Sequence, residues 1–301
     1  MRDEMIFEKE RLPHLTAFLF VCMIWGLSLV VAYDLLGTGM PPLFLIAVTY
    51  GIGALTILAA KLALGTAPAI SRDDLRYGIF AGLLIFAAFG LQTVGLVYTT
   101  PAKSGLLTIL YVLFVPIIIS AIRKRPSIRS IAFASVGFAG VLIMSGVAGG
   151  DASLNTGDFF TILCAAAFAA HFVTLEKFSP RLNTMNFALV QMTAAALVGI
   201  AVSLVLEIDQ YPNVDPAGSW MGLAFMGLIV TGLGFFVQTA VQKKIPSTTI
   251  SIMCCSESVF AMVFSWSLGY DAVTLPLLIG AALIIASTVL SSAYEKRELI
   301  G

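Results

Sequence analysis

The chain has 301 residues, of which 59% are apolar and only 11% are charged. This composition lies far outside the range of soluble globular domains and is typical of a protein embedded in lipid. The 17 Lys and Arg residues balance the 17 Asp and Glu residues, so the charge pattern excludes the polybasic or acidic tails that serve nucleic-acid or acidic partners.

Ten apolar runs follow one another along the sequence, each about as long as a helix that crosses a bilayer. Only helices and closed barrels satisfy their backbone groups in lipid, and these runs are much longer than barrel strands. The sequence therefore predicts an all-α membrane protein with ten transmembrane helices. The first run lacks a small-residue cleavage site and is expected to be retained. The expected spans are residues 15–33, 43–64, 75–97, 104–122, 128–147, 157–175, 187–206, 220–241, 250–268 and 275–293.

The positions of the basic residues predict the orientation of these spans. If the N-terminus is cytoplasmic, 16 of the 17 Lys and Arg residues fall on the cytoplasmic side and only Lys103 falls outside. Such an excess is the usual mark of cytoplasmic connectors. We therefore expect a multi-pass protein of the cell membrane, the inner membrane in a bacterium, with both termini in the cytoplasm. The outer connectors are acidic and include Glu207 and Asp209.

A polar connector at residues 148–156 leaves five spans on each side of it. An odd number of spans per half inverts the second half relative to the first. The sequence FGLQT at 89–93 also resembles FFVQT at 235–239, near the ends of the third and eighth spans. We expect two inverted five-helix repeats, 14–147 and 157–293, the plan of carriers that bind solute near the membrane midplane. The alternative is chance similarity between two apolar segments.

Several short motifs together resemble the EamA family of the drug/metabolite transporter superfamily. They include Trp25-Gly26 in the first span, Ala102-Lys103-Ser104 before the fourth and Gly280-Ala281-Ala282-Leu283-Ile284 in the tenth. The resemblance covers almost the whole chain. It implies ten helices in two repeats and transport of a small metabolite, amino acid or drug-like solute, with export as the expected direction. It does not identify the solute.

Three positions differ from the pattern of that family. Thr49 stands where members often carry an arginine in the second span, and Ser258 stands where a proline usually follows the glutamate of the ninth. Tyr270 replaces an acidic residue that is common at the end of the ninth span. These differences leave the expected fold unchanged but weaken any transfer of substrate or mechanism.

Two ionisable residues lie deep within the predicted spans. Glu257 lies near the middle of the ninth span, where a carboxyl group must face a cavity, be paired or be protonated. It is a candidate for binding a proton or a cationic part of the solute; the alternative is a neutral acid that bonds between helices. His171, in the cytoplasmic half of the sixth span, could relay protons, bind an anion or serve packing alone.

Four further residues are candidates for solute binding. Gln92 and Gln238 occupy equivalent places in the two repeats, where their amides could bind solute, act at two gates or bond between helices. Trp25 and Tyr111 could stack on a solute, although aromatic residues in membrane helices often pack or anchor instead.

Other kinds of function find less support in the sequence. The four cysteines lie inside apolar runs without metal-site spacing, so no metal or cofactor is expected. The chain has no P-loop, which favours a secondary transporter, driven by protons or by exchange, over an ATPase. An intramembrane enzyme is the main alternative, but HExxH and GxSxG motifs are absent. A channel or a receptor remains a further alternative. The expected partners are a small-molecule substrate and the bilayer.

Overall fold

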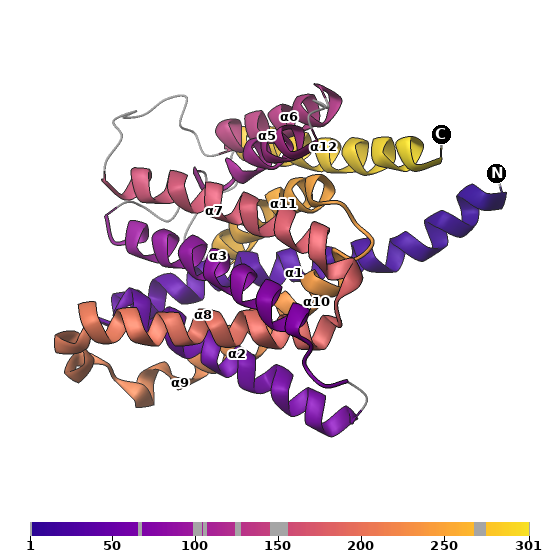
Figure 1. Cartoon of the computed structure of the whole chain (residues 1–301). Helices are drawn as coiled ribbons and strands as arrows, with labels where there is room; N and C mark the ends of the chain where they lie inside the picture. The colour runs from indigo at the N-terminus through magenta and orange to yellow at the C-terminus, as the bar shows by residue number, and fades with distance from the viewer. Residues whose placement is uncertain are drawn as a thin grey trace.

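The computed structural model of the chain describes residues 2–65, 68–98, 104, 107–123, 128–144, 156–267 and 275–300. All regular secondary structure in these ranges is helical, which confirms the predicted all-α class. The helices lie side by side in a bundle, and the two termini lie toward the same end of it (Figure 1). Lys103 and connector residues 148–155 lie outside the described ranges.

α-Helices make up most of the bundle. They are α1 (Arg2–Gly37), α2 (Pro42–Leu64), α3 (Arg72–Leu96), α5 (Tyr111–Arg123), α6 (Ile128–Met144), α7 (Thr156–Phe178), α8 (Thr184–Leu206), α9 (Pro216–Ala224), α10 (Gly234–Val241), α11 (Ser247–Ser267) and α12 (Leu275–Ile300). Short 3₁₀ helices η2 (Ser179–Arg181) and η3 (Ile208–Asn213) flank α8, and the π-helix η4 (Phe225–Leu233) joins α9 to α10.

Six helical segments in the described ranges are long and apolar enough to cross a membrane. They are Leu12–Gly37, Pro42–Leu64, Arg72–Leu96, Thr156–Arg181, Thr184–Leu206 and Ala217–Val241. Three shorter apolar helical segments lie at Tyr111–Ile122, Ile131–Gly140 and Leu278–Ser287. All nine fall within predicted spans or overlap them.

Local sequence signals fix the ends of several helices. Ser71 and Asp74 form a capping box at the start of α3, in which each side chain accepts a hydrogen bond from the other residue's backbone N–H. Asn183 caps α8 by accepting from two backbone N–H groups. Gly65 ends α2 with a φ of 60°, a conformation that glycine adopts without strain. These caps set where α3 and α8 begin and where α2 ends.

Many contacts between the helices follow a paired pattern. Two helix pairs, α2 with α8 and α6 with α12, are in close contact. Eight further contacts form four couples. The couples are α1–α11 with α5–α7, α3–α7 with α1–α10, α3–α8 with α2–η4, and α5–α6 with α11–α12. Helices far apart in the sequence thus bury their apolar faces against each other.

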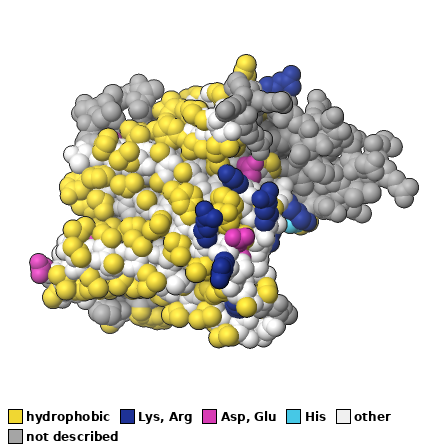
Figure 2. Space-filling view, in the orientation of Figure 1, with side chains coloured by type: hydrophobic (Ala, Val, Ile, Leu, Met, Phe, Trp, Pro, Cys, Tyr) yellow, Lys and Arg dark blue, Asp and Glu magenta, His cyan; other side chains and the backbone are white. Residues whose placement is uncertain are grey.

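The surface of the bundle is strongly apolar over most of its length (Figure 2). Large side chains such as Leu62 and Val205 are 73% and 79% exposed, as expected of helices that face lipid. Basic side chains gather near one end of the bundle in the same view. The exposed ones include Arg72, Arg76, Lys177, Arg181 and Lys244.

Gly26 lets α1 approach α11 closely beside Glu257. A Cβ atom added at Gly26 would lie 2.8 Å from the Glu257 carbonyl oxygen and 2.8 Å from the Ala261 backbone nitrogen. Because both atoms belong to the backbone, no side chain can move aside to make room. The contact therefore requires glycine at this position.

We expect Gly26→Ala to lower the thermal unfolding midpoint of the detergent-purified protein by about 5 °C, since overpacking costs roughly 1–3 kcal/mol. Gly51→Ala is the matched control, because nothing lies within 4 Å of a Cβ atom added there. Circular dichroism during heating measures both midpoints. Equal midpoints for the two variants would contradict the proposed backbone clash.

Candidate functional site

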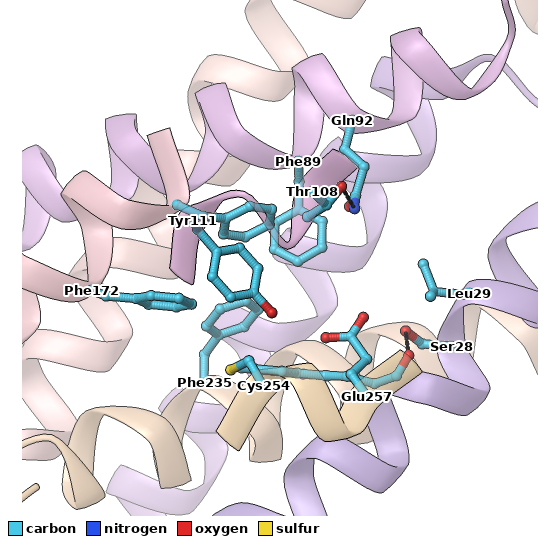
Figure 3. A pocket seen from close by; sticks show the side chains of 12 residues that line it. Ser28, Leu29, Phe89, Gln92, Thr108, Tyr111, Phe172, Phe235, Cys254 and Glu257 are labelled. Carbon is cyan, nitrogen blue, oxygen red and sulfur yellow. Dashed lines mark hydrogen bonds between the residues drawn. The ribbon is translucent and has the colours of Figure 1, made fainter. Parts of the chain in front are cut away.

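A pocket lies inside the bundle between the helices of the two halves of the chain (Figure 3). Its volume is about 40 Å³, room for a few water molecules, so a larger solute requires the surrounding side chains to move apart. Six of its lining residues are aromatic. The lining residues are Trp25, Ser28, Leu29, Phe89, Gln92, Thr108, Tyr111, Phe168, Phe172, Phe235, Cys254 and Glu257.

Glu257 gives this pocket its acidic character. It projects from α11, and Figure 3 shows its carboxyl group and the Tyr111 hydroxyl directed toward the same space. The described lining residues include one acidic side chain and no Lys or Arg. A carboxyl group in an apolar enclosure can hold a proton or pair with a cation, but it repels an anion.

Aromatic rings form the walls of the pocket. The ring centroids of Trp25 and Phe235 lie 5.3 Å apart, and those of Phe89 and Phe168 lie 4.8 Å apart in an edge-to-face arrangement. Trp25 also donates a hydrogen bond from Nε1 to the Val230 carbonyl over 3.3 Å, which fixes the orientation of the indole. Such faces attract flat apolar groups and organic cations.

Gln92 and Thr108 line the pocket next to these rings. The Gln92 amide donates to Thr108 Oγ1 over 3.0 Å, and that hydroxyl donates to the Ser104 carbonyl over 2.8 Å. Thr108, a residue of the same half of the chain, therefore fixes the orientation of the Gln92 side chain. Its amide oxygen is available to a hydrogen-bond donor.

His171 and Gln238 do not line the pocket, although both are fully buried. The His171 ring lies behind the wall, with its centroid 6.3 Å from those of Phe172 and Phe235. Gln238 bonds to Gln242 over 3.1 Å. Of the six candidate residues from the sequence, the structure brings Glu257, Gln92, Trp25 and Tyr111 together and leaves these two outside.

Eight lining residues are not among the six candidates from the sequence: Ser28, Leu29, Phe89, Thr108, Phe168, Phe172, Phe235 and Cys254. A usable signal existed for two of them, because Phe89 and Phe235 begin the repeated FGLQT and FFVQT motifs. Within the described ranges, no group of three or more His, Cys, Asp or Glu residues is placed to hold a metal ion.

Relatives of the chain are transporters by name. It is 26% identical over 273 residues to an uncharacterized transporter of Archaeoglobus fulgidus, covering 90% of this chain and 83% of the relative. It is 25% identical over 269 residues to the aromatic amino acid exporter YddG of Ancylobacter novellus, covering 86% and 90%. It is 23% identical over 287 residues to the uncharacterized transporter YoaV of Bacillus subtilis, covering 93% and 97%.

A solved crystal structure shares the fold. It superposes with a TM-score of 0.79 at 22% identity, over 95% of this chain and 98% of the other. The model of the EamA-like transporter family matches the chain twice, at residues 13–146 and 155–293. These two matches cover nearly the whole sequence and confirm the resemblance seen in its motifs. The chain belongs to the EamA-like transporter family.

Proposed function

We propose that the chain is a secondary transporter that exports a small solute by alternating access, using the aromatic pocket with Glu257 as its central site. In this proposal ten helices cross the membrane and both termini are cytoplasmic. Two inverted repeats, residues 14–147 and 157–293, form the carrier. The observation that carries the proposal is that the pocket is built almost equally from the two halves of the chain.

The packing of the helices supports an inverted repeat. The first half is exchanged for the second when α1, α2, α3, α5 and α6 are replaced by α7, α8, the continuous η4–α10 segment, α11 and α12. Each of the four couples of contacts is then converted into itself. The α2–α8 and α6–α12 contacts map onto themselves, as contacts on a two-fold axis do. A pseudo-two-fold axis in the membrane plane relates the repeats of many carriers.

The lining residues support the same relation at the site. Ten of the twelve lining residues form five couples, each with one residue from either half at equivalent positions. The residue numbers of a couple differ by 143 where α1 is matched with α7, and by 146 for the helices that follow. The Trp25–Phe235 ring contact is thereby the counterpart of the Phe168–Phe89 contact. The couples are Trp25 and Phe168, Leu29 and Phe172, Phe89 and Phe235, Thr108 and Cys254, and Tyr111 and Glu257.

The chemistry of the pocket favours a solute with an aromatic or apolar body and an amine. The rings accept the body, and Glu257 accepts the ammonium group. A relative named as an aromatic amino acid exporter is consistent with the aromatic part. The described lining has no basic residue for a solute carboxylate, so we propose that an amine is preferred to an amino acid. A proton gradient or solute exchange supplies the energy.

Counterflow in proteoliposomes tests this function. Vesicles loaded with unlabelled tryptamine should accumulate radiolabelled tryptamine transiently, with saturation, and radiolabelled tryptophan should accumulate at least about tenfold more slowly, since an unpaired carboxylate is costly in this site. Protein-free vesicles are the control. Flux without saturation or counterflow would indicate a channel, and tryptophan flux equal to that of tryptamine would contradict the preference for an amine.

A further inference from the structure

Two lining residues have equivalents that lie outside the pocket. Gln92 corresponds to Gln238 in the repeated motif, and Ser28 corresponds to His171 at the offset that relates Trp25 to Phe168. Ser28 and Gln92 line the pocket, whereas His171 and Gln238 are 0% exposed. Among the described residues, His171 Nδ1 and Gln238 Oε1 are buried atoms without a hydrogen-bond partner. Buried polar atoms are nearly always paired in folded proteins.

The hydrogen bonds around His171 define the role of its unpaired nitrogen. Thr239 donates its hydroxyl proton to the Phe235 carbonyl over 2.7 Å, so it accepts from Gln191 Nε2 over 2.9 Å. Gln191 Oε1 therefore faces His171 Nε2, 3.1 Å away, and that nitrogen must donate. In the neutral ring Nδ1 is consequently an acceptor.

A second chain of bonds defines Gln238 in the same way. Gln242 Nε2 donates to the Phe172 carbonyl over 2.9 Å, which leaves Gln242 Oε1 to accept from Gln238 Nε2 over 3.1 Å. The remaining Gln238 Oε1 is an acceptor. Both unpaired atoms are therefore acceptors that lack a donor. An ammonium group carries only donors, so it can bond to both.

Three equivalent positions of the first half bond within their own helices instead of between helices. Thr49, equivalent to Gln191 at the offset of 142 between α2 and α8, donates to carbonyls of its own helix. Thr93 and Ser28, equivalent to Thr239 and His171, do the same. Side-chain bonds tie α7, α8 and α10 together at this level, while Ser28, Thr49 and Thr93 bond within α1, α2 and α3.

We infer that His171 Nδ1 and Gln238 Oε1 form a cytoplasmic half-site for the amine of the solute. It corresponds to the half-site of Ser28 and Gln92 and is closed here by the bonds of Gln191 and Gln242. The inference rests on the proposed function, because it requires a carrier that opens toward each side. When α7 and α10 separate, the two acceptors become exposed to the pocket and replace Gln92 as the polar contacts of the solute.

Thiol labelling tests the closure without a transported solute. A Gln238→Cys variant should react slowly with a membrane-impermeant maleimide applied to the cytoplasmic face, and its four native cysteines are buried. Adding Gln191→Leu removes two hydrogen bonds between helices and should raise the labelling rate about tenfold. The matched control is Thr49→Val, which should leave the rate unchanged. An equal rise in both double variants, or no rise in either, would overturn the closure.

Sided transport tests the half-site itself. Gln238→Met should raise the half-saturating tryptamine concentration about tenfold at the cytoplasmic face only, and Gln92→Met should do so at the outer face only. Equal changes at both faces, or none, would overturn the half-site. If the unmodified protein transports neither tryptamine nor tryptophan, the proposed function fails, whereas the labelling result still decides the closure.

Discussion

Glu257→Gln should abolish the accumulation of tryptamine driven by a pH gradient in proteoliposomes. Gln keeps the size of the side chain but can neither release a proton nor balance a cation. If Glu257 carries the coupling proton, exchange of labelled for unlabelled tryptamine should persist, because exchange moves no net proton. If Glu257 binds the ammonium group, the half-saturating concentration should rise about tenfold or more in exchange as well.

The position of Glu257 in the pocket makes the two outcomes separable. Its carboxyl group points into the space that the rings of Tyr111 and Phe235 also face (Figure 3), so a change there reaches the solute directly. Glu257→Asp retains the charge and serves as the control, with partial accumulation expected. Unchanged accumulation by the Gln variant across the pH range would refute both roles and leave Glu257 as a structural residue.

Apolar run length predicted where several helices lie, but not the type of helix within a run. The run predicted at 43–64 became α2 at Pro42–Leu64, and the run at 187–206 became α8 at Thr184–Leu206. The run at 220–241, in contrast, contains the π-helix Phe225–Leu233. A π-helix adds one residue to a turn without changing hydropathy, so the run gives no sign of it.

The sequence predicts candidate site residues from their depth in a span and from the chemistry of their side chains, but not from the direction in which they face. Glu257 was found because a carboxyl group in mid-span is rare and has a narrow set of explanations. His171 shows the limit, since its neighbour Phe172 lines the pocket and His171 does not. Successive residues are about 100° apart around a helix, and one sequence does not fix which of them faces inward.

Glu207 shows a different limit, because its partners are distant in sequence. It was expected to be an acidic residue of an outer connector, yet it is 5% exposed. Its carboxylate accepts from the backbone N–H groups of Leu43 at 2.9 Å and Phe44 at 2.8 Å, and from the Ser203 hydroxyl at 2.8 Å. Pro41 precedes α2 and provides no side-chain cap. The sequence shows that Pro41 cannot cap α2 with a side chain, but it does not show that Glu207, at the end of α8, caps it instead.

Glu207→Ala should therefore destabilise the protein more than most substitutions at the surface. It leaves two N–H groups at the start of α2 without their charged acceptor and removes a favourable negative charge from that helix end, at a cost of roughly 2–4 kcal/mol. We expect the thermal unfolding midpoint in detergent to fall by about 5–10 °C. Asp209→Ala is the matched control, because it removes an exposed carboxylate two residues away. A similar fall in both variants would mean that charge near this end of the bundle matters and the bond to α2 does not. A fall in Glu207→Ala alone would mean that the α2–α8 contact depends on this carboxylate.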